Sequence, residues 1–153
     1  MCYSPGGVAE AERLAPFAVR PTTAIASIMG IGLSQVTVNE TCQDCANGKL
    51  HLDGIEYLYG KLTGDYGRTP PYPKSVRVAE SVGRSTNFSP KYVQHYRGVT
   101  MEISQAALNH PYRWYGPWAL STNFVHHNMT LLIVANTSQN TLKQLAYRIA
   151  QTP

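Results

Sequence analysis

Apolar and polar residues alternate along several short segments of the chain. In residues 35–41, two valines fall on one face of an extended strand while threonine and asparagine fall on the other. The same period of two runs through residues 75–81 and 96–104, and a shorter strand is expected at residues 55–58. Residues 124–135, which end in an unbroken apolar run, have the strongest strand pattern. These segments predict an antiparallel β-sheet.

Turn residues separate the predicted strands. Asn47-Gly48 favours a hairpin, because a type I′ turn needs positive φ at both central residues, and the return strand would begin at Leu50. Residues 60–73 are rich in glycine and proline and exclude a continuous strand. The apolar run 24–33 contains two glycines and fits either a buried strand or a short helix. Residues 1–33 are therefore interpreted as an N-terminal arm, and residues 34–153 as a single domain.

The C-terminal segment predicts an amphipathic helix. Thr137 or Ser138 can cap its N-terminus, and two cations in its later half suit the helix dipole. Its apolar positions recur at i, i+3, i+4 and i+7, and they are Leu142, Leu145, Ala146 and Ile149. Because a helix of this length is marginal alone, this stripe must be buried. Strands followed by one helix give an α+β fold, with an N-terminal hairpin, an antiparallel sheet and a C-terminal helix.

Composition narrows the class of protein. The 153 residues suffice for one domain, and charged residues make up only 14% of them, which argues against a coiled coil. Thirteen basic against nine acidic residues give a net charge of +4, which permits binding to a polyanion. No apolar run is long enough for a membrane span, and no ordinary signal peptide precedes the first apolar run, so we expect a cytosolic protein.

Candidate catalytic and metal-binding motifs are weak. The chain has no G-x-S-x-G elbow, H-E-x-x-H motif, P-loop or Rossmann glycine pattern. Cys42 and Cys45 form a single C-x2-C with His51 nearby, but a zinc site needs a fourth ligand, and Cys2 lacks suitable spacing. We therefore expect no enzymatic activity and no cofactor or metal.

Polar and basic residues follow the predicted strands. On residues 75–81, alternation places Arg77 beside two serines, Ser75 and Ser81. On residues 96–104 it places Tyr96 and Thr100 on one face, and the connecting loop adds Arg84 and Lys91. A sheet face with hydroxyls, an aromatic ring and cations can bind phosphates and unpaired bases of RNA. An ordinary solvated face has the same composition.

Three pieces of the C-terminal half resemble the coat proteins of single-stranded RNA bacteriophages, the leviviruses. KSVRVAESVGRSTNFSPKYVQHYRGVTMEIS is similar to the family's two central strands and their polar connection. HPYRWYGPW is similar to its variable loop, and NMTLLIVANTSQNTLKQLAYRIA to its final strand, turn and first C-terminal helix. Two departures are clear, since about thirty N-terminal residues have no counterpart and the family's second C-terminal helix is missing.

The resemblance implies a structural capsid protein of the virion, assembled in the cytoplasm of a bacterial host. It implies an intertwined homodimer in which each helix covers the partner's strands, assembly of dimers into an icosahedral shell, and viral single-stranded RNA on the opposite sheet face. No membrane is involved. By position, the family's RNA contacts fall on Ser75, Arg77, Ser81, Tyr96 and Thr100, and the helix residues above would bury the dimer core. Either the single helix or the N-terminal arm would take the role of the missing second helix.

Two other functions remain open from the sequence. Sequons at Asn39, Asn87, Asn128 and Asn136 are compatible with a secreted, glycosylated β-rich binding domain. Cys42, Cys45 and His51 are compatible with a small metal-dependent or RNA-processing enzyme.

Overall fold

The computed structural model describes residues 16–41, 54–59, 76–105 and 118–151. Its helices are α2 (Pro21–Met29), the 3-10 turn η1 (Leu33–Gln35) and α3 (Gln139–Ala150). Its strands are β1 (Thr37–Thr41), β2 (Gly54–Tyr59), β3 (Val76–Val82), β4 (Val93–Tyr96), β5 (Val99–Gln105), β6 (Trp118–Asn123) and β7 (Met129–Ala135).

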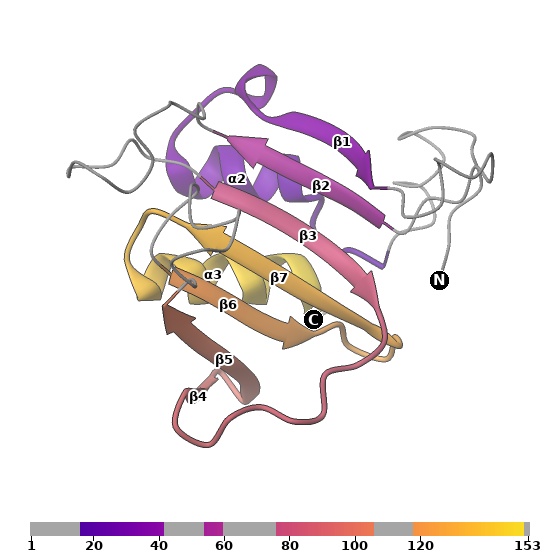
Figure 1. The fold of residues 1–153 in the computed structure, drawn as a ribbon. Helices are drawn as coiled ribbons and strands as arrows, with labels where there is room; N and C mark the ends of the chain where they lie inside the picture. Colours follow the sequence, from indigo (N-terminus) through magenta and orange to yellow (C-terminus); the bar gives the residue numbers. More distant parts are fainter. Residues whose placement is uncertain (1–15, 42–53, 60–75, 106–117, 152–153) are drawn as a thin grey trace.

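All these strands join one antiparallel sheet in the order β1-β2-β3-β7-β6-β5-β4, with β1 and β4 at its edges (Figure 1). The predicted α+β class, antiparallel sheet and C-terminal helix are confirmed. In the same sheet β1 pairs with β2, the strand predicted at residues 55–58, whereas the return strand predicted from Leu50 lies outside the described residues. The predicted turn of the N-terminal hairpin at Asn47-Gly48 lies outside them as well.

The hydrophobic core lies between one face of the sheet and the two helices, which lie together behind the sheet in Figure 1. The sheet contributes inward side chains from every second position, among them Tyr57, Val78, Met101, Leu120, Leu131 and Ile133. The four predicted apolar residues of α3 (Leu142, Leu145, Ala146 and Ile149) are fully buried in this core. Hydroxyl capping also follows the prediction, because Ser138 Oγ accepts the Thr141 backbone N–H at 3.2 Å.

The N-terminal segment packs into the same core. Residues 21–29 form a helix rather than a strand, with Pro21 in its first turn, where a missing N–H costs nothing. Ala24 and Ile25 are fully buried, and the Phe17 ring lies 5.8 Å from the ring of Tyr57 and 5.7 Å from that of Phe124. The interpretation of residues 1–33 as an arm is therefore wrong for residues 16–33, which belong to the folded domain.

Both ends of the described chain meet at the C-terminus of α3. The last carbonyls of a helix have no partner within it. Here the Ile149 carbonyl accepts the Ala18 N–H at 2.8 Å, and the Ala150 carbonyl accepts the Val125 N–H at 3.3 Å. The segment before α2 and the β6–β7 turn therefore fix where α3 ends.

The premise behind the expected intertwined dimer does not hold for the described residues, and the dimer itself stays a prediction. The premise was that one helix leaves the apolar sheet face exposed, so that a partner's helix must cover it. Instead α2 joins α3 on that face, and α3 lies on the strands of its own chain. Leu142, Leu145, Ala146 and Ile149 are thus core residues of one chain and need no partner to be buried.

A tight hairpin interrupts the predicted strand 96–104. Arg97 and Gly98 have φ angles of 50° and 79°, and Tyr96 pairs with Val99 across them. Positive φ at both central residues is the requirement of a type I′ turn, which matches the twist of the flanking strands. Because apolar and polar residues alternate on both sides of the turn, the sequence pattern is that of one continuous strand.

The predicted strand 124–135 begins later than expected. Residues 129–135 form β7, whereas residues 124–128 form the turn that follows β6, and His126 has a φ angle of 60° there. The strand β6 (Trp118–Asn123) has no counterpart among the predicted strands.

We expect Leu145→Ala to lower the free energy of unfolding by about 2–5 kcal/mol, because it opens a cavity beneath α3. Urea unfolding followed by circular dichroism measures this loss. Since α3 covers its own sheet, the unfolding midpoint of the unassembled protein is expected not to change with protein concentration. A midpoint that rises with concentration would mean that α3 packs on a second copy.

Replacement Gly98→Ala is expected to lower the free energy of unfolding by about 1–2 kcal/mol, because a Cβ strains the left-handed backbone although space is open around it. Gly32→Ala is the matched control, since Gly32 has a φ of −79°. Equal losses in the two variants, measured by thermal unfolding, would contradict the turn geometry.

Candidate nucleic-acid surface

Arg77, the central cation of the predicted RNA-binding face, is buried. It lies on β3, on the sheet face away from the helices, and its residue exposure is 5%. Its Nε donates to Glu56 Oε2 on the neighbouring strand β2 at 2.9 Å. The carboxylate neutralises this guanidinium within the sheet, so the pair stabilises the contact between β2 and β3 and leaves Arg77 less charge to offer a phosphate.

Tyr96 and Thr100 lie on opposite faces of the sheet. Thr100 is exposed on the face away from the helices, where its Oγ1 lies 3.2 Å from His95 Nδ1. Tyr96 lies on the helix side, with its ring 5.8 Å from that of Tyr147 in α3. The prediction that they share a face is wrong, because the turn at Arg97-Gly98 reverses the chain between them.

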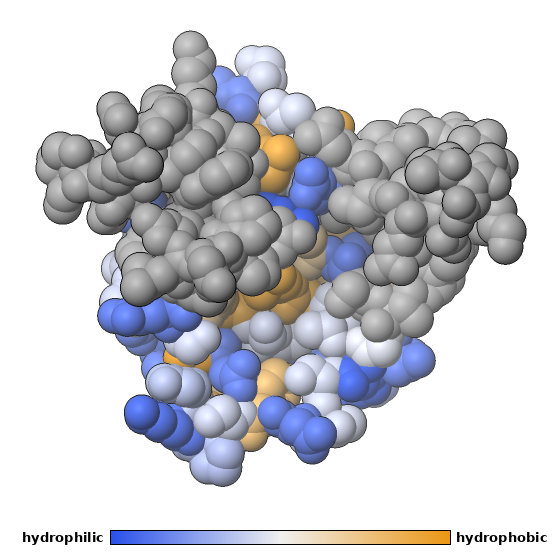
Figure 2. Space-filling model, in the orientation of Figure 1, coloured by the Kyte–Doolittle hydropathy of each residue, from blue (hydrophilic) through white to orange (hydrophobic). Residues whose placement is uncertain are grey.

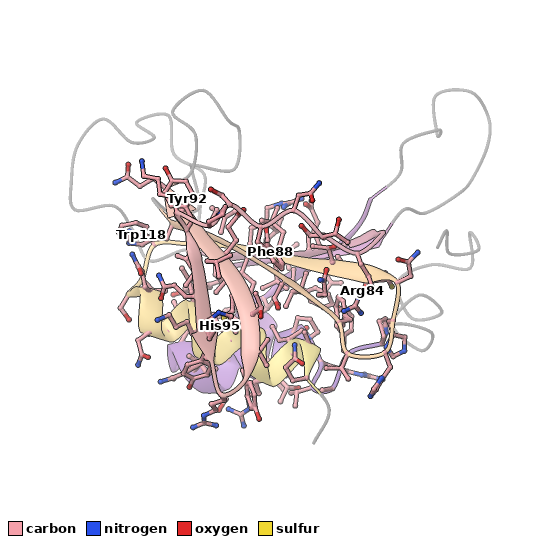
Figure 3. The ribbon with its side chains drawn as sticks, turned by 90° about the horizontal axis from the view of Figure 1, so that it is seen from below. Arg84, Phe88, Tyr92, His95 and Trp118 are labelled. Atoms are coloured by element: carbon pink, nitrogen blue, oxygen red, sulfur yellow. The ribbon has the colours of Figure 1, made fainter. Side chains whose placement is uncertain are left out.

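The two cations of the connecting segment lie far apart. Arg84 Nη1 donates to the carbonyls of Phe124 and His127, at 2.9 Å each, so this side chain ties the segment to the β6–β7 turn. Lys91 is exposed and lies over the ring of Tyr92, 5.4 Å from its centroid. Figure 3 shows Arg84 at one end of the molecule and Tyr92, next to Lys91, at the other.

The connecting segment itself lies over the sheet face on which RNA was expected. The Asn123 side chain exchanges two hydrogen bonds of 2.8 Å with the backbone of Ser85, and Glu102 Oε2 accepts the Ser89 N–H at 2.6 Å. Phe88 lies between these contacts on the same side (Figure 3). Strands β5–β7 are thus partly covered, and apolar side chains gather along the middle of this face (Figure 2).

The described members of the predicted RNA-binding set therefore do not share one surface. Ser75 and the Ser81 side chain lie outside the described part, Arg77 is ion-paired within the sheet, and Tyr96 lies on the helix side. Among the described side chains of the helix-free face are two carboxylates, Glu56, which pairs with Arg77, and Glu102, which accepts from the Ser89 backbone. This face is electrostatically mixed.

The helix side carries a different charge distribution. Its described charged side chains at the surface are all cations, and they are Arg20, Arg97, Lys143 and Arg148. Neither α2 nor α3 contains an acidic residue. Among the described side chains on this side of the sheet, the acidic Glu80 is only 5% exposed. We call this cationic surface, formed by α2, α3 and the β4–β5 turn, the helix-side surface.

Two tyrosines hold an arginine at the centre of this surface. The Arg97 guanidinium carbon lies 5.4 Å from the ring centroid of Tyr96 and 5.3 Å from that of Tyr147. The two rings meet edge to face, at 82°. Cations over aromatic faces are attracted by the ring quadrupole, so these contacts fix the position of the Arg97 side chain.

The sequence interpretation missed this cluster for a local reason. It treated Tyr96 to Ser104 as one strand and placed Arg97 on the apolar side, without seeing a turn. The signal was the Arg97-Gly98 dipeptide between two alternating segments, since glycine supplies one of the two positive φ angles of a hairpin turn. The sequence pattern gives Tyr147 no role, and it links Arg148 only to the helix dipole.

No protein-family model, curated protein or solved structure matches this chain. Within the described residues, no cluster of three or more histidine, cysteine, aspartate or glutamate side chains could hold a metal ion. The candidate ligands Cys42, Cys45 and His51 lie outside those residues. None of the described helices is long and apolar enough to cross a membrane.

A double-mutant cycle on Glu56 and Arg77 tests the role of this pair. We expect Arg77→Met and Glu56→Gln each to lower the free energy of unfolding by about 1–3 kcal/mol, since each leaves a polar partner without its counterpart. The double variant is expected to lose less than the sum. The RNA affinity of folded Arg77→Met is expected to equal that of the wild type. A weaker affinity would mean that Arg77 does contact RNA.

Proposed function

We propose that the protein is a non-enzymatic coat subunit of an RNA bacteriophage, which binds single-stranded RNA and assembles into an icosahedral shell in the bacterial cytoplasm. The resemblance of residues 74–104 and 128–150 to levivirus coat proteins motivates this proposal. The order of elements is compatible with it, since a basic strand, a polar connection, a final strand, a short turn and a helix follow each other in both.

The observation that carries the RNA-binding part is the separation of charge between the two sides of the sheet. The described surface charges of the helix side are cationic, whereas both described surface carboxylates of the strands lie on the other side. A polyanion is attracted to a surface on which no described carboxylate opposes the cations, and release of its counterions contributes to binding. RNA is therefore assigned to the helix-side surface rather than to the helix-free face.

We expect subunits to associate without exchanging α3 between them. Each chain closes its own core, so subunits associate as folded units through surfaces that remain available. The edge strands β1 and β4 are candidates, because an edge strand presents backbone N–H and C=O groups to a second strand. A symmetric contact along either edge would extend the sheet across a two-fold axis without moving α3.

Expression in bacteria tests the proposal. We expect the purified protein to sediment as regular particles, visible by negative-stain electron microscopy, and to contain nuclease-protected RNA detected by its absorbance spectrum and by gel. Particles that contain no RNA would contradict the RNA-binding part alone. A soluble monomer free of RNA at all concentrations would contradict the coat function.

A further inference from the structure

A pocket of about 520 Å³ opens on the helix-side surface, between the N-terminal segment, α2, α3 and the β4–β5 turn. This volume lies within the range of small-ligand sites. Residues from four separate parts of the sequence line it, and its polar and aromatic members are Tyr96, Arg97, Gln144, Tyr147, Arg148 and Gln151. Its described lining contains two guanidinium groups and no carboxylate.

One guanidinium of the pocket, that of Arg97, contacts two aromatic rings. Arg97 projects from a turn whose backbone is fixed by two positive φ angles, and the rings of Tyr96 and Tyr147 contact its cation. These contacts restrict the Arg97 side chain, so less conformational entropy is lost when it contacts an anion. The planar group also stacks favourably on a nucleobase.

The second guanidinium comes from α3. Arg148 Nη1 donates to Ser27 Oγ of α2 at 3.2 Å, which places the side chain across the groove between the two helices. A guanidinium has five N–H donors, so this contact leaves donors for a phosphate. Arg148 is exposed, as is Arg97, so an anion reaches both from solvent.

The remaining lining suits a base better than a simple anion. Tyr147 is half-buried, and its ring gives the pocket an aromatic wall. Gln151 donates its amide N–H to the Asn123 carbonyl at 3.3 Å, which leaves its amide oxygen as an acceptor, and the Gln144 amide is exposed. Aromatic rings and amides are the groups with which proteins stack and hydrogen-bond unpaired bases of RNA.

We infer that this pocket binds one nucleotide of single-stranded RNA, with the phosphate between Arg97 and Arg148 and the base against Tyr147. The inference rests on the proposed RNA-binding function and assigns it a location. The pocket reads an unpaired nucleotide, because a base within a duplex is stacked and cannot enter it.

Fluorescence anisotropy with labelled oligouridine and oligoadenine of about eight nucleotides tests the phosphate contacts. Arg97→Asn retains a residue that tolerates positive φ, and Arg148→Gln retains the length of the helix side chain. Each variant is expected to bind about tenfold more weakly at low salt and to reduce the salt dependence by about 0.7 in log–log slope. Lys143→Gln is the matched control, since it removes the same charge from the same helix outside the pocket lining, and it is expected to lose less than about twofold.

A second pair of variants tests the base contact. Tyr147→Leu is expected to weaken oligonucleotide binding about tenfold, whereas Tyr147→Phe keeps the ring and is expected to bind as the wild type does. Circular dichroism of each variant shows whether the fold is intact. An acidic peptide of the same length and charge serves as a probe for a purely electrostatic surface, and its affinity is expected to be insensitive to Tyr147→Leu.

The outcomes separate this inference from the coat function. Equal losses of RNA affinity in Arg148→Gln and Lys143→Gln would contradict binding in the pocket, as would unchanged affinity in the pocket variants. Neither result would contradict RNA binding elsewhere on the protein or its assembly. Loss of RNA binding in the pocket variants of a protein that forms no particles would support the pocket and contradict the coat function. Failure of the wild type to bind either oligonucleotide would overturn the pocket, whatever electron microscopy shows.

Discussion

Covering the apolar face of the sheet is the constraint on which the rest of this structure depends. Strands β2, β3, β5, β6 and β7 present buried side chains to one side, and a single helix of about three turns cannot cover such a sheet alone. Two helices from opposite parts of the sequence do so together, and the Ala18 N–H to Ile149 carbonyl bond joins the segments that flank them. Closure within one chain removes the physical reason for an exchanged helix.

The hydrophobic pattern predicted those strands and helices in which a single period continues until a turn or a helix cap ends it. Strand β3 and helix α3 lie close to their predicted positions, because alternation continues over β3 and a capped apolar stripe continues over α3, whereas β7 occupies only the apolar end of its predicted segment. The pattern failed at the Arg97-Gly98 turn, where the strands on both sides alternate and only two residues separate them. It also left the run 24–33 undecided, since an apolar segment fits a buried strand or a buried helix until its partner is known.

The site could be predicted less well than the fold. The face on which a side chain lies depends on strand register, and its contacts depend on which strand or helix lies beside it. Alternation correctly placed Arg77 on the face away from the core, yet nothing local shows that β2 brings Glu56 to its Nε. Tyr96 ends β4 and pairs with Val99 across the turn, so it shares the face of Val99 and lies toward the helices instead of beside Thr100. The pocket combines the N-terminal segment, α2, the β4–β5 turn and α3, so no sequence spacing could reveal it.

The strained backbone at Arg97 is related to the proposed binding of RNA. It and His126 are the non-glycine residues with positive φ in the described part of the chain, and such a backbone conformation costs of the order of 1 kcal/mol or more for a long side chain. A hairpin turn at this position could be formed by asparagine or glycine with less strain. Cation–π contacts with Tyr96 and Tyr147 offset part of this cost and place the guanidinium at the pocket. The cost is explained if the turn serves to present a cation to a ligand, because closing the hairpin alone requires no arginine.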